Sequence, residues 1–115
     1  MKELIIHTLE EDKAEGISVI DLKGKTSFAD MMILADGRSA RHVASIADSL
    51  VDLLKDIDSP HISLEGTETC DWVLLDTGDI VVHLFRPGVR DIYNLEKMWA
   101  VAPLDSDITN TQFIT

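Results

Sequence analysis

Hydrophobic residues recur at helical spacing over a long segment in the first half of the chain. From Ser39 to Ile57, apolar side chains follow one another at offsets of three and four, and polar side chains fill the opposite side. The pattern predicts an amphipathic helix in a region that ends at Pro60. The apolar side consists of Val43, Ile46, Ala47, Leu50, Leu54 and Ile57.

A weaker helical pattern occurs at the start of the chain. Residues 3–14 predict an acidic helix that is ended by Gly16, with Leu4 or Ile5 and then Leu9 facing inward. The short apolar run at its start is also compatible with a strand, and the helix is the favoured interpretation.

A second stripe near the other end predicts the last helix. It follows Pro87-Gly88 and reaches Pro103, and it leaves Tyr93 and Lys97 one turn apart on a different face. Residues 104–115 are rich in Asp, Thr and Ser without periodicity, so we expect a loose tail after a single domain of residues 1–103. The stripe consists of Val89, Ile92, Leu95 and Trp99.

Short apolar runs of strand length separate these helices. Ser18–Leu22 and Met31–Ala35 lie between glycines and predict two buried, neighbouring strands, and Ile62–Leu64 predicts a short one. Trp72–Asp76 and Asp79–Phe85 are joined by a glycine-containing turn and predict an antiparallel hairpin. Both hairpin strands are apolar on both faces, which is typical of central strands or of a sheet with one face reserved for a partner.

The predicted order of elements is α-β-β-α-β-β-β-α. This order indicates an α/β or α+β domain with a mixed sheet and flanking helices. The apolar runs are far too short to cross a bilayer, and the N-terminal residues lack the long apolar stretch of a signal peptide. We therefore expect a soluble, cytoplasmic protein without membrane contact.

Charge and cysteine content narrow the classes of partner. The 115 residues contain 10 Lys and Arg against 21 Asp and Glu, a net charge of −11. This excess of acid argues against direct binding of DNA or RNA and favours a basic partner. Cys70 is the single cysteine, so the sequence excludes an intrachain disulfide and indicates a reducing compartment.

Several features resemble catalytic or ligand-binding sites but lack essential parts. Gly24–Ser27 matches the end of a phosphate-binding loop, yet Val19 occupies the position of that motif's first glycine. The histidines match no compact metal motif, and the contexts of serine and cysteine nucleophiles are missing. We expect no metal and no cofactor, and we interpret His42 as a packing or capping residue and His83 as a hydrogen-bonded core or interface residue.

Two-metal phosphoryl transfer would need paired carboxylates on one face of a strand. Asp56 and Asp58 fall at a helix end, and the other D-x-D pair falls in the tail. Asp76 and Asp79 flank the hairpin turn, where polar turn residues are expected anyway. These positions argue against nucleotidyltransferase activity and against an enzyme in general.

An aromatic and charged set remains as a candidate protein-binding surface. Trp72 begins the hairpin, and Tyr93, Glu96 and Lys97 share a flank of the last helix away from its core stripe. From the pattern alone, a structural role is slightly favoured over a role in binding: Trp72 would cap the core, and Tyr93 would be an ordinary half-buried residue. A generic acidic interaction module therefore stays open as an alternative.

Eight short blocks, in their order along the chain, resemble the ribosomal silencing factor family, also called Iojap-like. The resemblance spans about residues 4–100, and the ordered set is specific although each block alone is weak. The blocks are Asp21–Ser27, Ala29–Ile33, Gly37–Val43, Ile46–Asp48, Glu65-Gly66, Asp71–Asp76, Gly78–His83 and Tyr93–Trp99.

The resemblance implies a nucleotidyltransferase-like α/β fold without a catalytic role. It also implies binding to the fourteenth protein of the large ribosomal subunit, where the small subunit docks, so that subunit joining is prevented when nutrients are short. The partner surface carries over as Trp72, Tyr93, Glu96 and Lys97, and a homodimer is implied as well. One departure is Asp36, where the family usually has a small or hydroxyl residue.

Overall fold

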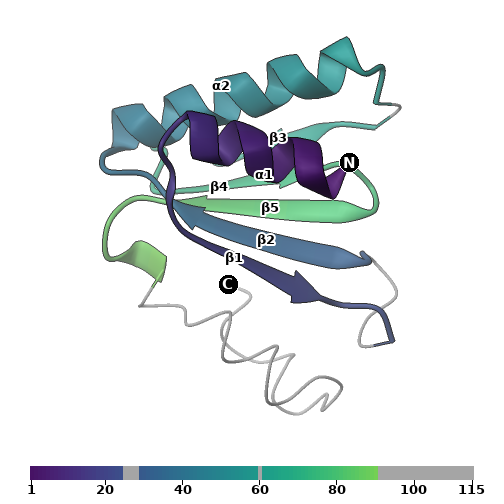
Figure 1. The fold of residues 1–115 in the computed structure, drawn as a ribbon. Coiled ribbons are helices and arrows are strands. Elements are labelled where there is room, and N and C mark those ends of the chain that lie inside the picture. The colour runs from purple at the N-terminus through teal and green to yellow at the C-terminus, as the bar shows by residue number, and fades with distance from the viewer. Residues whose placement is uncertain (25–28, 60, 91–115) are drawn as a thin grey trace.

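The computed structural model describes residues 1–24, 29–59 and 61–90, which form a mixed sheet with two helices (Figure 1). The predicted order of elements is confirmed as far as the last strand. Of the predicted last helix only the first positions, Val89 and Arg90, are described, and the rest of it and the tail lie outside the described residues. In chain order the elements are α1 (Lys2–Glu11), β1 (Glu15–Asp21), β2 (Met31–Asp36), α2 (Ala40–Asp56), β3 (Ser63–Glu65), β4 (Trp72–Asp76) and β5 (Ile80–Phe85).

The sheet has the strand order β1-β2-β5-β4-β3. Its central pair, β2 and β5, is parallel, and the other pairs are antiparallel. The predicted hairpin is confirmed, with Trp72 opposite Phe85 across β4 and β5. The predicted pairing of the first two strands is also confirmed, with Val19 opposite Ile33. The fold class of a mixed α/β domain is therefore correct, while the likeness to nucleotidyltransferases stays a prediction.

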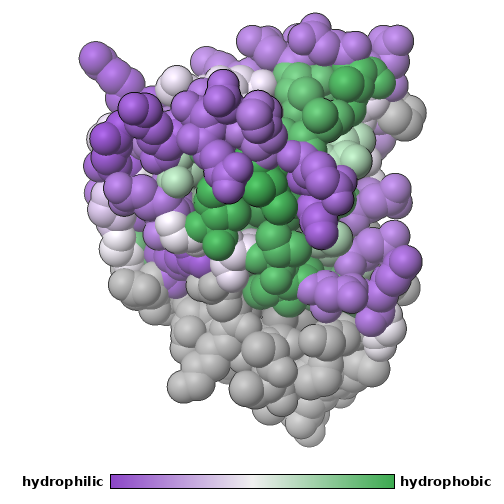
Figure 2. Space-filling model, in the orientation of Figure 1, coloured by the Kyte–Doolittle hydropathy of each residue, from purple (hydrophilic) through white to green (hydrophobic). Residues whose placement is uncertain are grey.

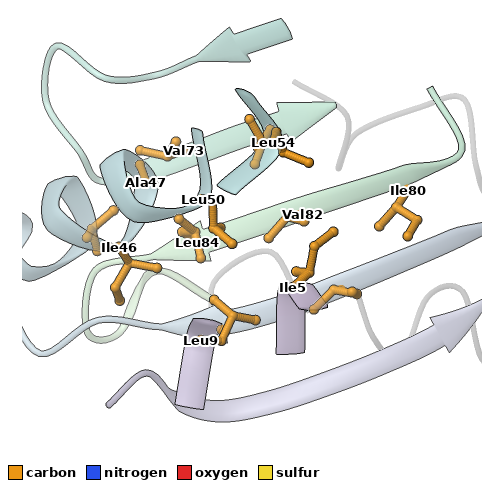
Figure 3. Packing of buried hydrophobic residues seen from close by; sticks show 14 of the residues in the cluster. Ile5, Leu9, Ile46, Ala47, Leu50, Leu54, Val73, Ile80, Val82 and Leu84 are labelled. Carbon is orange, nitrogen blue, oxygen red and sulfur yellow. The ribbon is translucent and has the colours of Figure 1, made fainter. Parts of the chain in front are cut away.

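Both helices cover the same face of the sheet (Figure 1). Figure 3 shows side chains of α1 and α2 meeting those of β4 and β5 between the layers. The amphipathic pattern of α2 explains this arrangement, because every third or fourth side chain reaches the sheet. The helix side chains that are buried here are Ile5, Leu9, Val43, Ile46, Ala47, Leu50 and Leu54.

The face of the sheet opposite the two helices carries a second apolar cluster. Because successive strand residues point to opposite faces, Val82 belongs to the first cluster and Val81 to the second. All six residues of β5 are buried, as predicted for a central strand. The buried members of the second cluster are Leu22, Ala29, Met32, Leu34, Val81 and Phe85.

The first strand differs from its prediction as a buried strand. Among the described strands, β1 is paired on one side only, by β2, and Val19 is 41% exposed. Central strands and edge strands can both have the sequence pattern of an apolar run between glycines. The sequence alone therefore did not show which kind of strand β1 is. β2, by contrast, is buried over four of its six residues, as predicted.

The ends of the two helices also refine the predictions. α1 ends at Glu11 rather than continuing towards Gly16, because Lys13 adopts a left-handed φ of 62° and the Ala14 N–H donates to the Leu9 carbonyl at 2.9 Å. At α2, Ser39 is the N-cap. Ile57 forms the C-terminal cap of α2 and is 39% exposed, so its predicted place in the inward stripe was wrong. Neither described helix has the length and apolar character needed to span a membrane.

Candidate protein-binding site

Trp72 is the one predicted partner-binding residue that lies within the described residues. It begins β4, is half-buried and packs against the second apolar cluster. Tyr93, Glu96 and Lys97 fall outside the described residues, so their predicted gathering with Trp72 stays a prediction.

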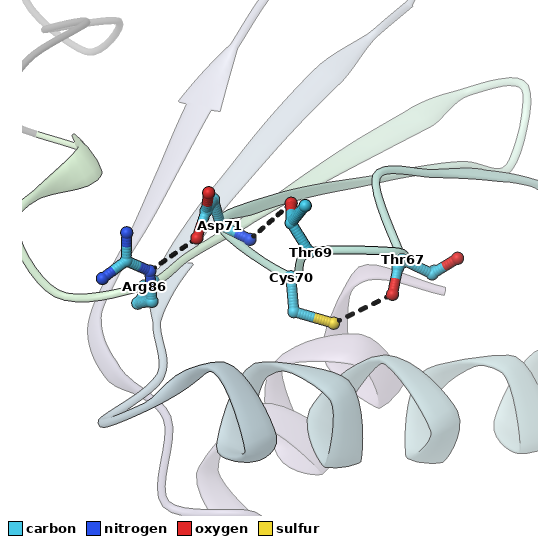
Figure 4. Close-up of polar contacts among 5 residues, drawn as sticks. All are labelled: Thr67, Thr69, Cys70, Asp71 and Arg86. Atoms are coloured by element: carbon cyan, nitrogen blue, oxygen red, sulfur yellow. Dashed lines mark hydrogen bonds and ion pairs between the residues drawn. The ribbon is translucent and has the colours of Figure 1, made fainter.

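The loop that leads into Trp72 is held by a set of polar contacts (Figure 4). The Arg86 side chain forms an ion pair with Asp71, with 2.6 Å between Nε and Oδ1. The Arg86 backbone N–H also donates to the Asp71 carbonyl at 2.9 Å. On the other side, the Cys70 thiol donates to the Thr67 carbonyl at 3.3 Å. Because the ion pair is half exposed, it adds little stability, but together these contacts fix the start of β4.

Trp72 forms an aromatic cluster with His83 and Phe85 of β5. The indole ring centroid lies 5.7 Å from that of His83 and 5.5 Å from that of Phe85. The His83 and Phe85 rings are stacked, 6.1 Å apart and 9° from parallel. Such separations fall in the range of favourable aromatic contacts. The aromatic cluster thus joins the predicted binding residue to the centre of the sheet.

A partly buried hydrogen bond fixes the indole within this cluster. The Trp72 Nε1–H donates to His83 Nδ1 at 2.8 Å. Since Nδ1 accepts, the neutral imidazole carries its proton on Nε2. His83 is only 8% exposed, and burial lowers its pKa from 6.5 to about 4. The ring is therefore uncharged at neutral pH, and the prediction of a hydrogen-bonded core histidine is confirmed.

The other candidate groups have structural roles or gather no ligand set. Asp76 Oδ1 accepts from the Gly78 N–H at 2.8 Å, as predicted for a turn residue. His42 bridges two segments, since its Nδ1 accepts from the Arg38 N–H at 2.8 Å and its Nε2 lies 2.7 Å from the Asp12 carbonyl oxygen. Its predicted packing or capping role is confirmed. Within residues 1–24, 29–59 and 61–90, no three His, Cys, Asp or Glu side chains gather to hold a metal ion.

A contact that sequence reasoning missed involves Asp36. Its Oδ2 lies 3.4 Å from Arg90 Nη1, and the same Arg90 nitrogen donates to the Gly16 carbonyl at 2.5 Å. Gly16 lies where the β1–β2 register shifts, and its φ is 57°. The unusual acid at position 36 therefore faces the guanidinium of Arg90, which the sequence placed at the start of the predicted last helix. The only signal in the sequence was that Asp36 and Arg90 have opposite charges, and this did not show that they are partners.

Nearly the whole chain is similar to known proteins. Residues 1–113 match the family model described as "Ribosomal silencing factor during starvation". The chain belongs to the ribosomal silencing factor family. Family membership makes it a ribosome-associated regulator of translation, as the ordered sequence blocks predicted.

Individual members and relatives of the ribosomal silencing factor family agree with this assignment. The ribosomal silencing factor of Zymomonas mobilis is 49% identical over 96 residues, which cover 84% of this chain and 72% of that protein. A mouse protein named "Mitochondrial assembly of ribosomal large subunit protein 1" is 28% identical over 109 residues, which cover 92% of this chain and 48% of the mouse protein. A crystal structure of a Chromobacterium violaceum protein has a TM-score of 0.83 at 35% identity, covering 99% of this chain and 95% of that one.

Proposed function

We propose that the chain binds the large ribosomal subunit through its fourteenth protein and blocks association with the small subunit, so that translation is repressed when nutrients are short. Membership of the ribosomal silencing factor family carries this proposal. The name of the mouse relative, which refers to the large subunit, supports the choice of subunit. The net charge of −11 suits a basic ribosomal protein better than bare nucleic acid, so direct DNA binding is not part of the proposal. A cytoplasmic location follows from the same role.

The proposed contact surface consists of Trp72, Tyr93, Glu96 and Lys97. Large aromatic side chains next to charged ones are typical anchors of protein interfaces. Trp72 supports the proposal because it is half-buried and held in place by His83 and Phe85, while Asp71, which precedes it in the chain, pairs with Arg86. A residue held in this way loses little conformational freedom when a partner binds.

Truncation of Tyr93 provides the direct test of this surface. We expect Tyr93→Ala to weaken binding to isolated large subunits about thirtyfold, or about 2 kcal/mol, as for a central interface anchor. Co-sedimentation of the variant with large subunits on a gradient measures the loss. Lys97→Ala is the matched control from the same segment, and its effect should be smaller and seen mainly at low salt. A folded Tyr93→Ala protein with undiminished binding would contradict the assignment.

The proposed role is not catalytic. Asp56 precedes the C-terminal cap of α2, Asp58 follows that cap, and Asp76 and Asp79 flank the turn between β4 and β5. None of these described pairs lies along one strand, which is where two-metal phosphoryl transfer would hold its ions. We expect no transferred nucleotide when the protein is incubated with labelled nucleoside triphosphates and Mg²⁺. Transfer that disappeared in Asp76→Asn would establish an enzyme instead.

A homodimer is also proposed, on the basis of the family resemblance. The strand β5 is buried within the chain, so its apolar residues offer no surface for a second copy. Hydrophobic areas nevertheless remain among hydrophilic ones on the side seen in Figure 2. Light scattering at tens of micromolar protein should give twice the chain mass, and a constant monomer mass would exclude the dimer. The exposed large apolar side chains of the described residues are Met1, Leu4, Val19, Ile57 and Leu64.

A further inference from the structure

Trp72 and His83 are diagonal neighbours on one face of the β4–β5 pair. In the register, Trp72 lies opposite Phe85, and His83 lies opposite Leu74. A leucine at position 83 would pack against the apolar cluster without the cost of burying a polar ring. The imidazole adds one thing that a leucine lacks, which is an acceptor for the indole N–H at 2.8 Å.

The hydrogen bond between the Trp72 indole and His83 should persist at neutral pH. His83 Nδ1 accepts only while the ring is neutral, because a protonated imidazole has donors on both nitrogens. Burial keeps the ring neutral. The indole has one N–H and no acceptor, so this single bond uses its whole hydrogen-bonding capacity.

We propose that His83 is a positioning residue for Trp72, which holds the indole by its N–H so that the binding partner meets only carbon atoms of the ring. This inference rests on the proposed function, since it concerns the same binding surface. It defines the chemistry of the contact: the partner places an apolar group on Trp72 and receives no hydrogen bond from it. His83 itself stays behind the surface, 8% exposed.

The first test needs no ribosome. Nuclear magnetic resonance separates the two indole N–H signals of the chain, and Trp72→Phe identifies which one belongs to Trp72. We expect His83→Leu to speed solvent exchange of the Trp72 indole proton at least about tenfold, because the acceptor is lost. His83→Asn, whose side-chain oxygen can replace Nδ1, should keep the exchange slow. Equal exchange in the wild type and His83→Leu would overturn the inference.

The second test uses the same variants with isolated large subunits. We expect His83→Leu to bind about tenfold more weakly and His83→Asn to bind almost like the wild type. Wild-type binding by a folded His83→Leu protein, alongside lost binding by Trp72→Ala, would reject the positioning role and leave the proposed function intact. Wild-type binding by Trp72→Ala would instead reject the proposed surface, and the exchange experiment would still decide whether His83 holds the indole.

Discussion

Gly66→Ala should destabilise the protein by at least about 3 kcal/mol, because backbone strain and a backbone collision act together. Gly66 has a φ of 85°, a conformation that residues with a side chain rarely adopt. A Cβ atom there would lie 2.2 Å from the Trp72 carbonyl oxygen and 3.3 Å from the Val73 Cα atom. Both contacts are with the backbone of β4, which is hydrogen-bonded between β3 and β5. The strand cannot move aside without weakening the sheet.

A variant at a second glycine, Gly78, separates the effect of the backbone collision from the effect of backbone strain. Gly78 has a φ of 100°, but a Cβ atom there would meet nothing within 4 Å. We expect Gly78→Ala to lower the free energy of unfolding only through the strain of the positive φ, by about 1 to 2 kcal/mol. Urea denaturation of both variants measures the two free energies of unfolding. Equal losses would show that the approach of Gly66 to β4 is not a constraint.

Acid should destabilise the protein through His83. An unfolded chain takes up a proton on this histidine near pH 6.5, whereas in the fold burial lowers the pKa to about 4. The contribution of His83 to the free energy of unfolding is therefore fully present above pH 6.5. It falls as the pH drops from 6.5 to 4 and is lost below pH 4. The shift corresponds to a loss of about 3 kcal/mol.

The comparison with His83→Asn isolates this contribution, because the other histidines and the carboxylates titrate in both proteins. Urea denaturation at pH 7, 5.5 and 4 should show the wild type losing its advantage over His83→Asn as the pH falls. The difference in free energy of unfolding between the two proteins should shrink by about 3 kcal/mol over this interval. A difference that does not vary with pH would mean that His83 titrates normally in the fold.

The elements that could be predicted from the sequence are those that depend on residues close together along the chain. The stripe of α2 and the turn between β4 and β5 are encoded by residues close in sequence, and both were found in the structure. Trp72 was placed at the start of the hairpin, and His83 on one face of its second strand. Their hydrogen bond was not predicted, because it depends on the register between β4 and β5.

The features that could not be predicted depend on pairing between distant segments. The exposure of Val19 follows from the position of β1 at the sheet edge, which only the strand order reveals. The Asp36–Arg90 contact joins residues 54 positions apart. Lys13 takes a left-handed conformation that glycine usually occupies, so Gly16 was the more reasonable sequence signal for the end of α1.

The parallel pairing of β2 with β5 has a consequence for the synthesis of the chain. Met31 and Ile80, which are paired in this ladder, are 49 positions apart, so 49 further residues must be translated after Met31 before the centre of the sheet can close. Until then β2 has β1 alone as a neighbour. Trp72 gains the ring contacts and the hydrogen bond that hold it only when β5 arrives. A nascent copy in which β5 has not yet been made therefore lacks an ordered Trp72, and the proposed binding surface forms only after β4 and β5 have paired.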